Sequence, residues 1–164
     1  MAPARLAITA EPLSIEALTA EVEALARVHD EGCGAVAVFL GVVRATHKGR
    51  RVRHLEYEAF EPLAIKVFAR IEAEAAERWP GARLGVQHRI GRLAVGEASI
   101  AVVAATPHRD VAFRVCRYAI ERVKQIAPVW KHEFFDDGEA WVEGATAHPD
   151  DRDAQRDALA IACA

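Results

Sequence analysis

The stretch Lys124-Gln-Ile-Ala-Pro-Val-Trp-Lys131 marks the point where a helix must give way to an extended segment. Residues 111–123, just before it, have the apolar spacing of an amphipathic helix. Pro128 cannot continue that helix, and it biases the residue before it toward extended geometry. The pattern therefore predicts Lys124 near a helix C-terminus and Lys131 on the strand or loop that follows.

Two ammonium groups on either side of this sharp chain reversal indicate a site for an anionic ligand. Lys124 follows Ile120 and Cys116 at helical spacing, so it borders the apolar stripe of the helix rather than the middle of its polar face. Partial desolvation at that position favours the neutral amine, which is the nucleophilic form. The alternative is that both lysines are ordinary surface residues, as most lysines are.

The rest of the chain alternates short strands and helices. Ser14 predicts the N-cap of a helix that stops near Gly32, Pro62 fits the first turn of a second helix, and a third helix follows His108. An apolar run over residues 34–43 predicts a buried strand. Further strands are expected over residues 5–10, 52–59, 84–90, 98–105, 129–135 and 140–142. This mixture predicts an α+β fold with a largely antiparallel sheet and about three main helices.

Composition limits the classes of protein to which the chain can belong. It has 164 residues, 52% of them hydrophobic and 27% charged, and its net charge of −3 argues against a dedicated nucleic-acid binder. No apolar run approaches the ~20 residues that span a membrane. The N-terminus lacks the apolar core of a secretory signal. We expect one domain over residues 1–144 and a tail over residues 145–164, either helical or frayed.

The spacing of the three cysteines indicates neither a metal site nor a disulfide framework. Cys33, Cys116 and Cys163 are widely spaced, with no Cys-x-x-Cys pair. This arrangement fits a reducing cytoplasm. Cys116 itself is expected to fill the core on the third helix.

Two further basic groups are candidates for the same site as the lysines. Arg44 comes directly after the apolar run, where a rigid strand would hold it, whereas the basic residues of the following loop are expected to be solvated. Thr106 and Pro107 fit the start of a helix, whose free N–H groups attract anions. His108 and Arg109 follow there and offer a proton donor and a bidentate phosphate ligand. An ordinary capped helix with two exposed side chains explains that motif equally well.

These motifs together resemble the large, catalytic subunit of molybdopterin synthase. The resemblance runs in order from about Gly34 to Gly144, and it includes the Asp137-Gly-Glu139 turn and Trp141. The tail after Gly144 is not covered by it. The matching strings are Phe39-Leu-Gly-Val-Val-Arg44, Leu55-Glu-Tyr-Glu-Ala59, His88-Arg-Ile-Gly-Arg-Leu-Ala-Val-Gly-Glu97, Pro107-His-Arg109, Cys116-Arg-Tyr-Ala-Ile120 and Lys124 to Lys131.

The resemblance implies an α/β-hammerhead fold and a sulfurtransferase activity. The family converts cyclic pyranopterin monophosphate (precursor Z) into molybdopterin, a step of molybdenum cofactor biosynthesis. Sulfur arrives as a thiocarboxylate on the C-terminal Gly-Gly of a small ubiquitin-like partner, whose tail enters the pocket of the large subunit. Two large subunits form a homodimer with one small subunit on each, which gives a heterotetramer. The resemblance implies no cofactor and no metal.

The resemblance also assigns roles to individual residues. It implies that Lys124 is the essential lysine and Lys131 the second active-site lysine. The implied substrate-binding residues comprise both lysines together with Val42, Val43, Arg44, His108, Arg109, His132 and Glu133. An electropositive pocket of this kind suits a pterin phosphate and a thiocarboxylate alike.

Two other functions remain open on the sequence alone. The first is a non-catalytic binder of phosphorylated small molecules or acidic partners, in which only the charge of the lysines would matter. The second is a lyase that forms a Schiff base on Lys124.

Overall fold

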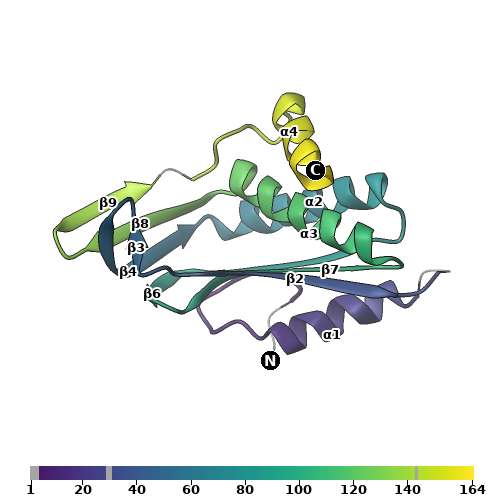
Figure 1. Ribbon diagram of the computed structural model, residues 1–164, viewed down its shortest axis with the longest axis horizontal. Helices are drawn as coiled ribbons and strands as arrows, with labels where there is room; N and C mark the ends of the chain where they lie inside the picture. The colour runs from purple at the N-terminus through teal and green to yellow at the C-terminus, as the bar shows by residue number, and fades with distance from the viewer. Residues whose placement is uncertain (1–3, 29–30, 143) are drawn as a thin grey trace.

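The main sheet has four strands and lies between helices. The computed structural model describes residues 4–28, 31–142 and 144–164. The first strand pairs parallel with its neighbour, and the other neighbouring strands of this sheet are antiparallel. Figure 1 shows the sheet as a long central layer. In spatial order its strands are β1 (Leu6–Thr9), β5 (Arg83–Arg89), β7 (Ala98–Thr106) and β2 (Ala35–Val42).

A second, fully antiparallel sheet projects from one end of this layer (Figure 1). A two-residue turn at Asp136 and Asp137 joins its last two strands, which agree with the strands predicted over residues 129–135 and 140–142. The predicted α+β class with a largely antiparallel sheet is confirmed, and the projecting sheet agrees with a hammerhead-like shape. Its strands are β3 (Thr46–His47), β4 (Arg50–Ala59), β8 (Val129–Phe135) and β9 (Gly138–Val142), with β6 (Gly91–Ala94) also paired to β4.

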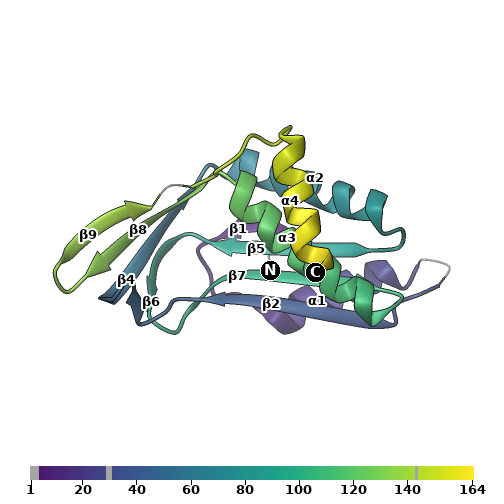
Figure 2. The same cartoon turned by 45° about the horizontal axis from the view of Figure 1, so that its top comes forward.

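The helices cover both faces of the main sheet. The larger core lies on one face, under two long helices, and the smaller core lies on the other face, under the first helix. The last helix crosses the outside of the layer, over α3 (Figure 2). In chain order the helices are α1 (Ile15–Ala26), α2 (Glu61–Arg78), α3 (Arg109–Ile126) and α4 (Arg152–Cys163). The described residues thus form four helices, where the sequence predicted about three.

Strand β2 differs most from the sequence prediction. The apolar run was expected to be a buried strand, but β2 is the edge of the main sheet and pairs only with β7 within the described residues. Its exposed side chains include Val38, Phe39, Leu40 and Val42, each 36–46% exposed. An apolar run has the same appearance whether the chain's own core or another molecule covers it, so the prediction of burial was wrong for this chain alone.

The other corrections are local. The connections that were expected to be loops contain the short strands β3 and β6. The N-cap of α3 is His108 and not Thr106. Thr106 ends β7, is fully buried, and donates its hydroxyl to the carbonyl of His108 at 2.7 Å. Helix α1 ends earlier than the predicted stop near Gly32: its inward face contains Leu18 and Val22, whereas Val28 lies beyond the helix and is 81% exposed.

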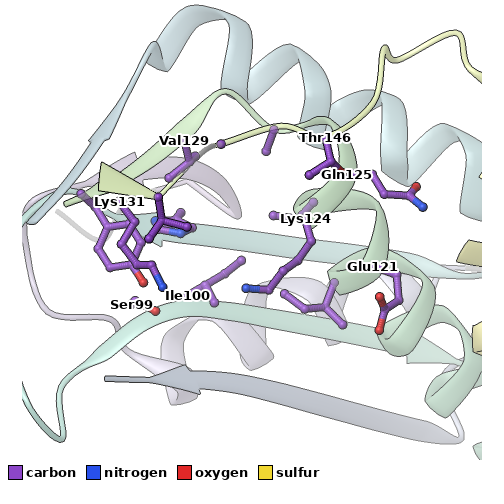
Figure 3. Close-up of a pocket in the computed structure, with 15 residues that line it drawn as sticks. Ser99, Ile100, Glu121, Lys124, Gln125, Val129, Lys131 and Thr146 are labelled. Atoms are coloured by element: carbon purple, nitrogen blue, oxygen red, sulfur yellow. The ribbon is translucent and has the colours of Figure 1, made fainter. Parts of the chain in front are cut away.

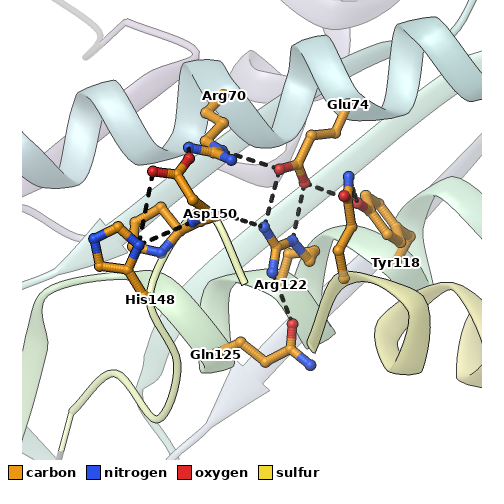
Figure 4. A network of polar contacts seen from close by, with 9 residues as sticks. Arg70, Glu74, Tyr118, Arg122, Gln125, His148 and Asp150 are labelled. Carbon is orange, nitrogen blue, oxygen red and sulfur yellow. Dashed lines mark hydrogen bonds and ion pairs between the residues drawn. The ribbon is translucent and has the colours of Figure 1, made fainter. Parts of the chain in front are cut away.

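A buried ionic network fastens the end of the chain to α2 and α3 (Figure 4). Arg122 of α3 is fully buried and makes two hydrogen bonds of 2.9 Å to Glu74 of α2. Glu74 also accepts from Tyr118 at 2.8 Å and from Arg70 at 3.1 Å. Arg70 in turn contacts Asp150, just before α4, at 2.7 Å. Burial alone would raise the pKa of Glu74, but these donors outweigh burial and lower it.

We predict that Arg122→Ala lowers the free energy of unfolding by about 3–5 kcal/mol, because it leaves the Glu74 carboxylate buried without its main partner. Arg117→Ala is the matched control, since Arg117 pairs with Glu121 on the exposed side of the same helix. Its cost should be about 0.5 kcal/mol or less, as for surface ion pairs. Urea denaturation measures both. Equal losses in the two variants would contradict the prediction.

Candidate active site

The two lysines converge where α3 ends and β8 begins. The last backbone bond of the helix joins the Ala127 amide to the Val123 carbonyl, and Pro128 then turns the chain into β8. Lys124 lies in the last turn of α3, and Lys131 is the third residue of β8. Both side chains point into one pocket of about 430 Å³ (Figure 3). The prediction that Lys124 lies near a helix C-terminus and Lys131 on the following strand is therefore confirmed.

A second pocket of about 300 Å³ adjoins the first, and the two share both lysines. Arg44 lines this second pocket, directly after β2. Val42 and Val43 line it too, and Val43 is buried. The structure thus brings Arg44 and its two neighbours to the lysine pair, so three basic side chains meet where the pockets join, together with the carboxylates of Glu121 and Glu133.

Lys131 is held by a buried carboxylate. Its Nζ lies 2.5 Å from Oε1 of Glu133, whose Oε2 lies 2.5 Å from Nδ1 of His47. Glu133 is only 2% exposed. Burial alone would raise the pKa of Glu133, but the hydrogen bonds from Lys131 and His47 outweigh it and lower that pKa. The ion pair fixes the position of the Lys131 side chain.

Lys124 has a different environment. It makes no ion pair within the described residues. Its pKa is lowered, first by desolvation through burial and then by the positive charges of Lys131 and Arg44. Glu121 opposes this shift without cancelling it. The side chain stays accessible because it lines open pockets, yet protein atoms replace much of the water around its amine. A larger share of Lys124 is therefore neutral than for a free lysine.

The pocket wall contains further polar residues that were not predicted as site residues from the sequence, among them Tyr57, His88 and Ser99. The ring of His88 contacts the Tyr57 ring edge-on at 4.9 Å, and its Nδ1 hydrogen-bonds the Arg89 carbonyl at 2.7 Å. Because a carbonyl only accepts, Nδ1 carries the proton. Burial lowers the pKa of His88 to about 4, despite the opposing Arg89 contact, so the ring is neutral.

A signal for His88 was present in the sequence. Leu84 and Val86 precede it at alternate positions of β5 and face the core under α2 and α3. His88 is the next position on the same side of the strand. A polar residue that continues an apolar inward row is a candidate for a pocket wall.

The structure does not bring the His132 side chain to the lysines. Because side chains alternate along a strand, His132 faces away from Lys131 and Glu133. Its ring stacks on Trp141 at 4.3 Å and contacts Phe134 at 4.2 Å, on the other face of the second sheet.

His108 and Arg109 also lie away from the lysines within one chain. They are at the N-terminal end of α3, and the 15 residues from Arg109 to Lys124 span about 22 Å along a helix axis. There they line a separate pocket with Gly34 and Pro107. The expectation that all three basic groups share one pocket therefore holds for Arg44 and the lysines, but it is wrong for His108 and Arg109 in a single chain.

Neither a metal site nor a membrane span is found in the part of the chain that the structure describes. It contains no cluster of three His, Cys, Asp or Glu residues that could hold a metal ion. None of its helices is both long and apolar enough to cross a bilayer.

We predict that Lys124 reacts with acetic anhydride at a lower pH than free lysine does. Its labelling midpoint should lie below the ordinary lysine pKa of 10.5, for the reasons given above. In Lys131→Met the midpoint should rise, because a neighbouring positive charge is lost. Peptide mass spectrometry across a pH series measures both. A wild-type midpoint equal to that of free lysine would refute this assignment.

Known proteins resemble this chain in sequence and in fold. A model of the MoaE protein family matches residues 8–126. The molybdopterin synthase catalytic subunit of Bacillus subtilis (strain 168) is 42% identical over 148 residues, which are 88% of this chain and 90% of that protein. The crystal structure of molybdopterin synthase from Staphylococcus aureus has a TM-score of 0.78 and 38% identity, covering 86% of this chain and 98% of that one.

A further solved structure supports the fold alone. It is a complex of subunits 1 and 2 of the molybdopterin-converting factor from Helicobacter pylori 26695. It has a TM-score of 0.68 and 24% identity over 88% of this chain and 94% of that chain. With a family model that matches most of its length and a relative of 42% identity along nearly all of it, the chain belongs to the MoaE protein family.

Proposed function

We propose that this chain is the catalytic subunit of a molybdopterin synthase. In this role it is a sulfurtransferase that converts precursor Z to molybdopterin with sulfur from a thiocarboxylated partner. The observation that carries the proposal is the pocket in which Lys124, with a lowered pKa, lies beside Lys131 and Arg44. The three cysteines of the chain are free thiols, which fits a reducing environment, so we place this activity in the cytoplasm.

The site suits transfer between two anionic groups. The two pockets meet at the lysines, so one can hold the pterin while the other receives the extended Gly-Gly tail of the partner. The fixed charges of Lys131 and Arg44 attract the phosphate and the thiocarboxylate. Lys124, more readily neutral, is the group suited to accept a proton or to attack.

Cys116, which lines a pocket together with Lys124, is a poor candidate for the sulfur carrier. Cys116 is buried on α3, and burial raises the pKa of its thiol to about 11. A thiol of that pKa is almost fully protonated at neutral pH and is a weak nucleophile. The sulfur is therefore not expected to be carried on Cys116, as the proposed delivery by a partner thiocarboxylate requires.

The substrate-binding pair His108 and Arg109 would act in the pocket of a second copy. Strand β2 joins the two regions: its start lies at Thr106, to whose carbonyl the Gly34 amide donates, and its end leads into Arg44. Eight strand residues span about 26 Å, close to the 22 Å that separate the two groups along α3. Two copies that pair antiparallel through their exposed β2 edges would bring His108 and Arg109 of one to Arg44 of the other.

Two other functions remain to be separated from this one. A non-catalytic binder of phosphorylated small molecules or acidic partners would keep its affinity when Lys124 becomes arginine, because only charge matters there. A Schiff-base lyase would be trapped on Lys124 by borohydride with a carbonyl substrate. The lowered pKa of Lys124 favours a role as a proton acceptor or nucleophile over a purely electrostatic role.

We predict that Lys124→Ala reduces molybdopterin formation by ~100-fold or more, while the complex with the partner persists. Lys124→Arg should fail as well, since arginine stays protonated at working pH. The assay combines precursor Z with a thiocarboxylated small subunit and detects the dithiolene product. A partner that lacks its last two glycines is the control, and normal product with it would sink the sulfur-transfer proposal.

We predict that mixed dimers of Lys124→Ala and Arg109→Ala subunits recover activity that neither variant has alone. One of the two sites in each mixed dimer then has an intact lysine and an intact arginine from the other copy. Random mixing should restore about a quarter of wild-type turnover, since half of the dimers are mixed and each has one good site. If both residues act within one chain, no activity returns.

A further inference from the structure

The C-terminal segment, residues 144–163, forms a wall of the lysine pocket. Gly144 and Thr146 line the pocket together with Lys124 and Lys131, and Figure 3 shows Thr146 beside the end of α3. The segment lies beyond the part of the chain that the family model matches.

The segment closes the end of the helix that carries Lys124. The amides of Thr146 and Ala147 both donate to the carbonyl of Gln125, at 2.8 and 2.9 Å. That carbonyl is among the last four of α3, which have no partner within the helix. The C-terminal segment therefore supplies the missing donors one residue after Lys124.

The same segment also packs against the strand that carries Lys131. A Cβ on Gly144 would come within 2.6 Å of the Val129 carbonyl oxygen, so only glycine fits this close approach. The wall thus touches the end of α3 through Gln125 and the start of β8 through Val129. It bridges the two elements whose junction places the lysines side by side.

Arg122 holds the wall from behind. Besides its pair with Glu74, it donates to the side chain of Gln125 at 3.0 Å and to the carbonyl of Pro149 at 3.3 Å. Gln125 passes the link on, since its Nε2 donates to the carbonyl of Ala154 in α4 at 2.9 Å. Figure 4 shows Arg122 at the centre of these contacts. One buried guanidinium therefore ties α2, α3 and the C-terminal segment together.

We propose that the C-terminal segment is part of the active site, as the wall that fixes Lys124 relative to Lys131, and that Arg122 is the positioning residue that holds it. The effect on turnover rests on the proposed function, whereas the effect on Lys124 itself does not. The wall also sets the width of the pocket and so contributes to which pterin or peptide tail can enter.

Loosening the wall has a defined electrostatic consequence. The charged and titratable groups that face Lys124 are Lys131 on β8, Glu121 on α3, Arg44 after β2 and His88 on β5. A displaced wall admits water around the amine and lets Lys124 move relative to Lys131, and both changes weaken causes that lower its pKa. Because desolvation is the largest cause of the lowered pKa, that pKa should move up toward its ordinary value.

The test compares Arg122→Lys with Arg117→Lys, the same change at an exposed position of the same helix. Arg122→Lys keeps the charge but loses the fork that binds Glu74, Gln125 and Pro149 together. Hydrogen exchange at the Thr146 and Ala147 amides should become faster by roughly tenfold, the scale of one lost charged hydrogen bond. The acetylation midpoint of Lys124 should rise, and the KM for precursor Z should rise more than kcat falls. Arg117→Lys should change none of these.

A second variant covers the case in which Arg122→Lys does not fold. Tyr118→Phe removes only the hydroxyl that joins Glu74 to Gln155 of α4, and it should shift the same readouts in the same direction by less. Faster exchange of the Thr146 and Ala147 amides with an unchanged acetylation midpoint of Lys124 would overturn the proposal that this segment fixes Lys124. Unchanged exchange in both variants would overturn the role of Arg122. Absence of product from the wild-type protein would instead overturn the proposed function, and the labelling result would stand.

Discussion

The end of α3 at Pro128 is the constraint on which the site depends. The chain must leave the layer above the main sheet there and enter the second sheet, and a proline makes the change abrupt. The Pro128 carbonyl accepts the Phe60 amide at 3.3 Å, which ties this turn to the start of α2. Lys124 before the turn and Lys131 after it therefore meet. No flexible loop separates them, so their spacing is set by the backbone.

The ammonium groups of Lys124 and Lys131 repel each other at this short separation, and the surrounding residues reduce that repulsion in a different way for each lysine. Lys131 has a buried carboxylate partner in Glu133, whose second oxygen is taken by His47, so its charge is balanced and its position is fixed. Lys124 has no such partner among the described residues, and its strain is relieved by loss of the proton. One pocket thus contains a permanent cation and an amine that is readily neutral. A transfer reaction between anions needs both, one to bind charge and one to move a proton.

The sequence predicted local features well, because they depend on neighbours along the chain. The helix before Pro128, its end at this proline and the strand that follows were all predicted correctly. It failed where distant segments decide the outcome. Burial of β2 depends on what lies across a sheet edge, and the Arg122–Glu74 pair joins residues 48 positions apart. Such contacts leave no periodic signal.

The length of helix α3 sets the distance between two cationic groups of the chain. Its 18 residues hold a cationic group at each end, with Arg109 at the start and Lys124 in the last turn, too far apart to bind one small molecule within a single chain. Strand β2 runs beside it over a similar length and exposes apolar side chains that the chain's own core does not cover. The dimer proposed above accounts for both facts, because a second copy covers β2 and places its own Arg109 at the Lys124 end of the first copy's α3. In that dimer, assembly would bury the exposed edge and complete the pocket in the same step, and a lone chain would have half a site at each end of one helix.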